Sequence, residues 1–378
     1  MSAELNKARQ RLVDEYLNAL QEDVIPWHQE WASGKAINGI TKKPYNGMNQ
    51  LLLSHIAYIN NYNDPRWMTL HQANEKGWRI KAGAKGTPIE FWSLYDELQR
   101  KNISIKEAND LISADESRRA FIKWKVRNYT VFNGEQITGI PKYEEPLYKI
   151  KDPQPFIDTL IQEMGVTYIE EGGRAYYSPG DDSVHIPPSE LFEDNYSYQT
   201  TRLHELSHAT GHSSRLNRQL SNGFGTTEYA KEELRAEIAS SFIAADLQLQ
   251  FDQKHLNNHK AYIQSWISIL QNDPNELFRA IKDANSIYDY VAKTGHLEIY
   301  QLKEGIINDE ILEDRINTLV EDGLIDQNTA DLVMTEHKEA VLEQLKKCSV
   351  EELKSEDIWF DVIKEVAEDI HISVRKGR

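Results

Sequence analysis

Apolar residues recur along most of this chain at helical spacing, which predicts many amphipathic helices. Residues 1–22 place their apolar side chains on one side of a helix, and residues 155–164 predict another. Short apolar runs bounded by glycine and proline predict strands at 166–170, 174–178 and 183–186. After residue 246 the pattern is helical. The helices over 261–272 and 275–293 are expected to support the helical segments that contain residues 204 and 233. The fold class predicted is α+β.

The length of 378 residues suggests two or three domains, and 40% hydrophobic residues are enough for real cores. Four prolines among mixed charges between 141 and 155 indicate a linker. The predicted domains are therefore 1–145, 146–298 and 299–378.

The sequence gives no indication of a membrane or secretory segment. It has no run of 18 apolar residues, and its N-terminus lacks an apolar signal core. The single cysteine, Cys348, excludes an internal disulfide and is typical of a reducing compartment. We expect a cytoplasmic protein without a membrane partner.

The most specific chemical pattern is His204-Glu205-Leu-Ser-His208, a His-Glu-x-x-His motif. Residues four apart share one face of a helix, so both imidazoles can bind one metal ion. Glu205 follows the first ligand, where it can reach a water at the metal without binding the metal itself. A chance occurrence in a chain with 12 histidines is the alternative.

Two carboxylates in the next helical segment are candidates for the third ligand. Glu233 and Glu237 are four residues apart and share a face. The segment resembles the Glu-x-x-x-Asp signature of gluzincin metallopeptidases, which implies that Glu233 binds the metal and Glu237 orients His204. The reverse assignment stays open. Two histidines and a carboxylate suit Zn²⁺, with another divalent ion such as Mn²⁺ as the alternative. His212 is expected at the helix end rather than as a ligand.

The N-terminal third combines aromatic and basic residues, although the net charge of the chain is −17. Residues 41–92 hold seven Lys and Arg against three Asp and Glu. Rings interleaved with cations suit a groove for single-stranded nucleic acid, because bases stack on the rings while cations follow the phosphates. The alternative is that most of the rings form a core.

The order of motifs resembles the ArdC antirestriction family over roughly residues 5–295. The motifs are Lys43-Pro-Tyr-Asn-Gly, Arg66-Trp-Met-Thr, Phe132-Asn-Gly-Glu-Gln and His204-Glu-Leu-x-His-x-x-Gly-His. The resemblance implies a mobile-element protein that protects incoming DNA from restriction. It also implies a small mixed α/β domain that binds single-stranded DNA, followed by a zincin-like metallopeptidase domain. The candidate DNA-binding residues are Lys43, Tyr45, Asn46, Asn49, Arg66, Trp67, Gln72, Lys81, Lys85, Trp92 and Arg127.

Three further segments carry open interpretations. Residues 95–127 predict a charged helical insertion, which is either simply solvated or flanks the DNA groove with its basic end. In zincin-like folds the strand before the active helix pairs with an extended peptide, so 182–187 is either that strand or an ordinary one. Residues 301–378 carry 20 acidic and 10 basic residues on amphipathic helices, which either mimic DNA or cover the basic groove, or form a solvated appendage.

Two functions are compatible with this sequence. One is a zinc-dependent endopeptidase tethered to single-stranded DNA, whose candidate substrates are DNA-associated or restriction proteins. The other is a DNA-coating protection protein whose metal site is structural or vestigial.

Overall fold

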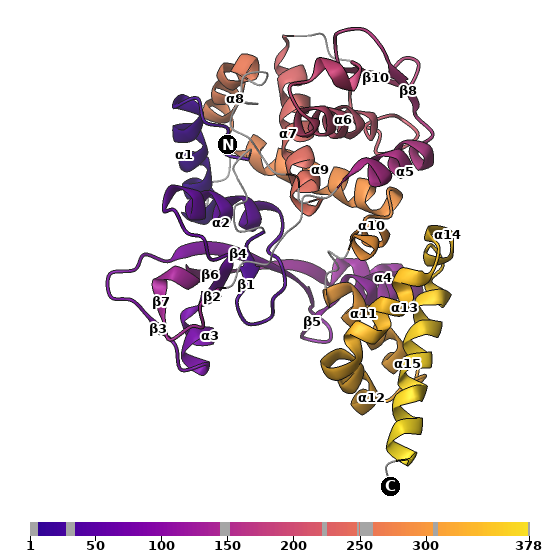
Figure 1. The fold of residues 1–378 in the computed structure, drawn as a ribbon. Helices are drawn as coiled ribbons and strands as arrows, with labels where there is room; N and C mark the ends of the chain where they lie inside the picture. Colours follow the sequence, from indigo (N-terminus) through magenta and orange to yellow (C-terminus); the bar gives the residue numbers. More distant parts are fainter. Residues whose placement is uncertain are drawn as a thin grey trace. The chain divides into compact units, whose positions relative to one another are not determined.

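The computed structural model describes residues 7–27, 35–143, 152–220, 225–247, 249, 260–304 and 309–376. Within these ranges, helices combine with a five-stranded, a three-stranded and a two-stranded sheet, which confirms the α+β class (Figure 1). By its internal contacts the chain forms two compact units, Met1–Leu147 with Phe251–Lys282 and Tyr148–Gln250 with Asp283–Arg378. The domain boundaries at 145/146 and 298/299 stay a prediction. This grouping differs from them at Phe251–Lys282, and it places residues 299–378 in the second unit.

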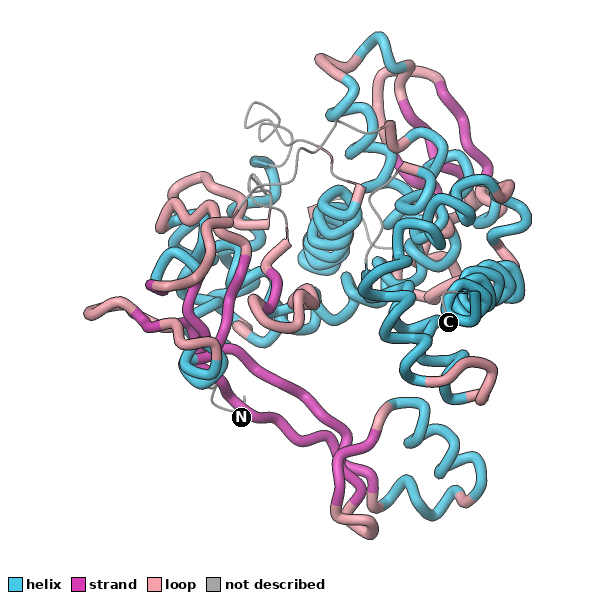
Figure 2. Tube along the Cα trace, turned by 60° about the horizontal axis from the view of Figure 1, so that its bottom comes forward, coloured by secondary structure: helices cyan, strands magenta, loops and turns pink. Residues whose placement is uncertain are grey.

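The first unit is built on the five-stranded sheet, in the order β1-β2-β6-β4-β5. Its strands are β1 (Ile37–Asn38), β2 (Arg66–Thr69), β4 (Thr87–Asp96), β5 (Lys101–Ile103) and β6 (Ile122–Asn133). β1 and β2 pair in parallel, and the other pairs are antiparallel. β4 and β6 form a long two-stranded ribbon, which Figure 2 shows extending beyond the shorter strands. β3 (Arg79–Ile80) and β7 (Ile137–Thr138) form the small sheet.

The prediction of a helical insertion over 95–127 is correct only for its middle. There, α4 (Ile105–Ala114) begins with a capping box between Ser104 and Glu107, and a 3-10 turn follows at Glu116–Ala120. The flanks are strands, since β4 continues to Asp96 and β6 begins at Ile122. From Ile122 to Arg127 apolar and basic side chains alternate, which is the period of a strand.

Helices cover the rest of the first unit. They are α1 (Lys7–Gln21), α2 (Gly47–Ile59), α3 (Leu70–Glu75) and α8 (Lys260–Asn272). α1 confirms the helix predicted over residues 1–22 from Lys7 to Gln21, and residues 1–6 of that prediction lie outside the described residues. Its Tyr16 ring lies 5.9 Å from Trp27, and Trp27 lies 5.1 Å from Trp266 of α8. α8 thus contributes to the core of the first unit, and the expectation that it supports the helices of the candidate metal site stays a prediction.

The second unit begins with α5 (Gln154–Met164) and a three-stranded sheet. Its strands are β8 (Thr167–Glu170), β9 (Tyr176–Ser178) and β10 (Ser183–Ile186), at the predicted positions. β10 lies in the middle, parallel to β8 and antiparallel to β9. Because both of its edges are already paired, the prediction that 182–187 pairs with a peptide is wrong, and β10 is an ordinary sheet strand.

The remaining helices of the second unit form two groups. The first consists of α6 (Asn195–Ala209), α7 (Thr227–Asp246), α9 (Asn275–Thr294) and α10 (Leu297–Lys303), with α9 beginning in the first unit. The second consists of α11 (Asp309–Glu321), α12 (Gln327–Leu332), a π-helical turn (Val333–His337), α13 (Lys338–Lys347), α14 (Val350–Leu353) and α15 (Glu356–Lys376).

The acidic C-terminal segment has a hydrophobic core of its own. Trp359 is fully buried there, its Nε1 donates to the carbonyl of Leu353 at 3.0 Å, and the guanidinium of Arg315 lies 4.3 Å from its ring centroid. This confirms the amphipathic helices predicted for 301–378. Among the helices that the structure describes, none has the length and hydropathy that spanning a bilayer requires.

Candidate metal centre and candidate DNA-binding residues

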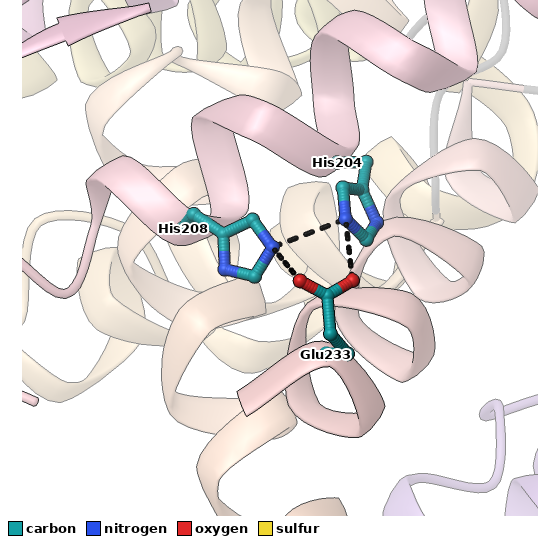
Figure 3. A group of neighbouring side chains, drawn as sticks. All are labelled: His204, His208 and Glu233. Carbon is teal, nitrogen blue, oxygen red and sulfur yellow. Dashed lines mark hydrogen bonds and ion pairs between the residues drawn. The ribbon is translucent and has the colours of Figure 1, made fainter. Parts of the chain in front are cut away.

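The His-Glu-x-x-His motif lies on α6, which is held by a capping residue at its start and by packing against a neighbouring helix. The carboxylate of Asp194 accepts the backbone N–H of Ser197 at 2.8 Å and caps the helix. α6 packs against α7, and this contact brings the motif to the carboxylates of the second helix. His204 and His208 lie one turn apart on the side of α6 that faces Glu233 (Figure 3).

Three potential ligand atoms converge between α6 and α7. Nε2 of His204 and Nε2 of His208 are 3.1 Å apart, and each lies 3.4 Å from an oxygen of Glu233 (Figure 3). Tetrahedral ligands about 2.0–2.1 Å from zinc are about 3.3–3.4 Å from one another. In the described part of the chain, these three side chains form the one group of at least three His, Cys, Asp or Glu residues whose possible ligand atoms all lie within 4.8 Å of one another. The residues present therefore fit a divalent ion.

Further carboxylates face the opposite nitrogens of the two rings. Nδ1 of His204 lies 3.4 Å from Glu237, and Nδ1 of His208 lies 3.3 Å from Glu232. Such contacts fix the ring orientation and direct Nε2 toward a metal. Glu233 thus faces the Nε2 atoms, whereas Glu237 lies on the outer side of His204.

Glu232 and Arg218 are residues of this site that the sequence analysis missed. Arg218 donates to both oxygens of Glu232, at 3.2 and 2.7 Å. It also donates to Thr210 Oγ1 at 2.7 Å and to the carbonyl of Ser207 at 2.9 Å. The guanidinium thereby fixes Glu232 against His208. Helical periodicity did not identify Glu232, because neighbours in sequence point about 100° apart around a helix.

Glu205 has the environment of a proton-transfer group. It is only 8% exposed, and burial raises its pKa above the usual value, while the nearby charges of His204 and His208 oppose that rise. The backbone N–H of Tyr177 in β9 donates to its carboxylate. A carboxyl group whose pKa is moved toward neutrality can take up and release a proton during a reaction.

His212 lies outside the three-ligand group, as expected. Its Nδ1 bonds Ser214 Oγ at 2.8 Å and lies 3.9 Å from Asp182. Arg215 also pairs with Asp182, and its Nε donates to the carbonyl of Ala209 at 2.7 Å. These contacts hold the segment that follows α6 against β9 and β10.

Opposite charges control the pKa values of the three candidate ligands. Burial lowers the pKa values of the two histidines, but the facing carboxylates outweigh it and raise them, most strongly for His208. Burial raises the pKa of Glu233, but the two facing imidazoles outweigh it and lower it far below its usual value. Without a metal, this arrangement therefore favours protonated imidazoles beside an ionised Glu233.

Metal affinity is expected to fall as the pH is lowered, beginning above the ordinary histidine pKa of about 6.5. The raised pKa values mean that both rings stay protonated to a higher pH than a free histidine, and a proton on Nε2 excludes the metal. Calorimetric titration of metal into metal-free protein at a series of pH values measures this. An affinity that stays constant from about pH 8 to about pH 6 contradicts it.

The candidate DNA-binding residues fall into two groups. Trp67 is 1% exposed, and Arg66 is buried with its Nη2 2.6 Å from Asp64. Gln72 closes a capping box with Thr69 at the start of α3. Asn49 donates to the carbonyl of Glu90 at 2.7 Å.

Tyr45 also belongs to the internal group. Its hydroxyl donates to the carbonyl of Trp67 at 3.3 Å, and burial raises its pKa to about 12. These five residues stabilise the first unit from within. The exposed group consists of Lys43, Asn46, Lys81, Lys85, Trp92 and Arg127.

Substitution of Trp67 by alanine is expected to lower the free energy of unfolding of the first unit by about 3–5 kcal/mol. The ring is fully enclosed, and its loss leaves a cavity beside β2 and β6. Denaturant unfolding of the full chain, followed by tryptophan fluorescence, measures the change. Trp124→Ala is the matched control, because that ring is 58% exposed. Equal effects of the two substitutions contradict a core role for Trp67.

Two families match this chain. Residues 6–132 match the N-terminal domain of anti-restriction factor ArdC, and residues 155–283 match a zincin-like metallopeptidase. The matches lie in the same order as the two sets of motifs in the sequence.

Relatives of known sequence match across both parts. A protein named DNA primase TraC from Escherichia coli is 35% identical over 287 residues, which are 74% of this chain and 19% of the relative. This chain therefore spans about a fifth of that relative's length. The uncharacterized protein y4eC from Sinorhizobium fredii is 31% identical, and the match covers 71% of this chain and 84% of that protein.

Solved structures agree in fold. The metal-free crystal structure of antirestriction ArdC protein from R388 plasmid matches with a TM-score of 0.60 and 27% identity, over 77% of this chain and 98% of that one. The Mn(II)-bound structure of the same protein matches with a TM-score of 0.59. The chain belongs to the ArdC-like family of antirestriction proteins, in which an ArdC N-terminal domain precedes a zincin-like metallopeptidase domain.

Proposed function

We propose that this protein hydrolyses peptide bonds with the help of a divalent metal ion held by His204, His208 and Glu233. The observation that carries the proposal is the meeting of two Nε2 atoms and the Glu233 carboxylate at distances of 3.1–3.4 Å, which suits tetrahedral coordination. When bound, the ion supplies Lewis acidity that polarises a peptide carbonyl and makes water more acidic.

Glu205 supplies the proton transfers of this reaction. As a carboxylate it accepts the proton of the attacking water, and as a carboxylic acid it passes that proton to the leaving amine. Burial favours its neutral form, and the N–H of Tyr177 favours its charged form, so both states are accessible. Glu232 and Glu237 hold the two imidazoles in orientation and take no part in the proton transfer.

Zn²⁺ is the ion we propose, because two imidazoles and one carboxylate form the ligand set of many zinc hydrolases. Mn²⁺ is the alternative, and the Mn(II)-bound structure of a related protein supports a divalent metal. The test uses the purified protein of 378 residues and an unfolded protein substrate. Cleavage is expected with Zn²⁺ or Mn²⁺, lost on chelation and restored by the ion. Absence of cleavage with both ions overturns the proposal.

We also propose that the N-terminal domain binds single-stranded DNA. The match of residues 6–132 to the ArdC N-terminal domain and the basic balance of residues 41–92 support this function. The peptidase would then act on DNA-associated or restriction proteins in the cytoplasm. The proposed domain boundaries are those predicted from the sequence, 1–145, 146–298 and 299–378.

A DNA-coating protein with a structural metal site is the alternative function. A restriction digest in the presence of wild-type protein and of Glu205→Gln distinguishes the two. Full protection by the variant, together with no cleavage by the metal-loaded wild type, favours the coating protein. Protection that requires Glu205 favours the peptidase.

A further inference from the structure

The ribbon of β4 and β6 has two faces with different chemistry. Residues two apart on a strand point to the same side, and directly paired residues share a face. The register pairs Phe91 with Arg127, Ser93 with Lys125 and Tyr95 with Lys123. We call this side the cationic ribbon face, and it consists of Phe91, Ser93, Tyr95, Lys123, Lys125, Arg127 and Tyr129.

Aromatic rings on this face are open to solvent. Phe91 is 55% exposed and Tyr129 is 40% exposed. Their ring centroids are 6.2 Å apart at an interplanar angle of 79°. Each ring therefore presents surface to solvent on a ribbon that does not bury it, and a base can stack on a ring presented in this way.

The charges on the cationic ribbon face are all positive, in a chain whose net charge is −17. Lys125 lies with its Nζ 3.0 Å from the ring centroid of Tyr95. Lys123 and Arg127 are exposed, and within the described part of the chain neither forms an ion pair. The two acidic residues of the paired segment, Glu90 and Asp96, are buried and bound by Arg9 and Arg118. Lys123 and Arg127 can therefore attract an anion without displacing an internal partner.

We infer that the cationic ribbon face is the surface that binds single-stranded DNA, an inference that rests on the DNA-binding function proposed above. Bases stack on Phe91 and Tyr129, while Lys123 and Arg127 contact phosphates on the same side. Stacking on protein rings requires bases whose faces are free, and in a duplex those faces are covered by neighbouring base pairs. An acidic protein would satisfy the cations but would leave the two rings without a planar partner.

The opposite face of the ribbon provides matched controls. Trp124 is 58% exposed and lies there opposite Leu94, with a ring as accessible as that of Phe91. Trp92 on that face donates through Nε1 to Glu90 at 2.8 Å, so part of its surface is already engaged. Lys106 in α4 is an exposed cation away from the paired strands.

The test measures fluorescence anisotropy of a labelled oligothymidine with the wild-type protein of 378 residues and four variants of it. Phe91→Ala and Tyr129→Ala are each expected to weaken binding by about 5- to 150-fold, the equivalent of one lost base stack. Lys123→Gln combined with Arg127→Gln is expected to reduce the slope of log affinity against log salt by about 1.4. Trp124→Ala combined with Lys106→Gln is expected to bind like the wild type. Thermal unfolding confirms that each variant is folded.

Each outcome separates this inference from the function on which it rests. If the wild type binds tightly and the Phe91, Tyr129 and double-cation variants bind equally tightly, the cationic ribbon face is not the binding surface. The proposal that the protein binds DNA is then unaffected. A loss of affinity in the Trp124→Ala, Lys106→Gln control as large as that in the other variants also overturns the inference. No binding of oligothymidine by wild type rejects the DNA function itself. Duplex DNA, RNA or an acidic peptide that competes better than oligothymidine assigns the face to another partner and contradicts the inference.

Discussion

The variant Glu205→Gln is expected to lose peptide hydrolysis by about 100- to 10,000-fold while it retains its metal. Glutamine has nearly the same size and can still accept the N–H of Tyr177, but it cannot take up a proton from water. The ligand atoms of His204, His208 and Glu233 stay in place. Hydrolysis of an unfolded substrate and metal content by mass spectrometry, measured on the same samples, test this.

Glu193→Gln is the control for this prediction, because that carboxylate is exposed before the cap of α6. It is expected to hydrolyse substrate at the wild-type rate. Undiminished cleavage by Glu205→Gln would show that another group transfers the proton. A joint loss of metal and activity would show that Glu205 supports the ion instead.

The second large effect concerns two carboxylates of α7, Glu233 and Glu237. Glu233→Gln is expected to weaken metal binding by more than about 100-fold, because it removes a ligand that faces both Nε2 atoms. Glu237→Gln is expected to weaken it by about 10- to 100-fold, because it only releases the orientation of His204. Competition with a fluorescent chelator measures both affinities.

Glu228→Gln on the same helix serves as the control, since that side chain is 58% exposed and pairs with Lys231, one turn away. It is expected to bind metal as the wild type does. A larger loss for Glu237→Gln than for Glu233→Gln would reverse the assignment of ligand and orienting residue. No loss for any variant would exclude a metal site at these residues.

The spacing of residues along the sequence was enough to predict the two histidines of the candidate metal centre. Residues four apart on a helix lie on the same face, so His204 and His208 share a face whatever surrounds the helix. The same rule placed Glu233 and Glu237 on one face but could not rank them. Their order depends on how α7 is rotated and shifted against α6, which is set by packing between residues distant in sequence. The partnership of Glu232 with Arg218 depends on the same packing.

The N-terminal unit shows where composition misleads. Arg66 and Trp67 fit a nucleic-acid groove by residue type, yet both are buried, and Asp64 neutralises the guanidinium. Burial depends on tertiary packing and cannot be read from one aromatic or basic residue. By contrast, apolar and basic residues alternate from Ile122 to Arg127, which is a pattern that predicts a strand. It was assigned to a helix because a charged helical segment precedes it. The exposed ribbon that results has rings and cations on one side.

The most direct measurement of the central claim is anomalous X-ray scattering from crystals of the metal-loaded protein. A single strong peak is expected about 2.0–2.2 Å from Nε2 of His204, from Nε2 of His208 and from an oxygen of Glu233. A peak that lies elsewhere, or no peak at these three residues in protein shown to contain the ion, would contradict the account.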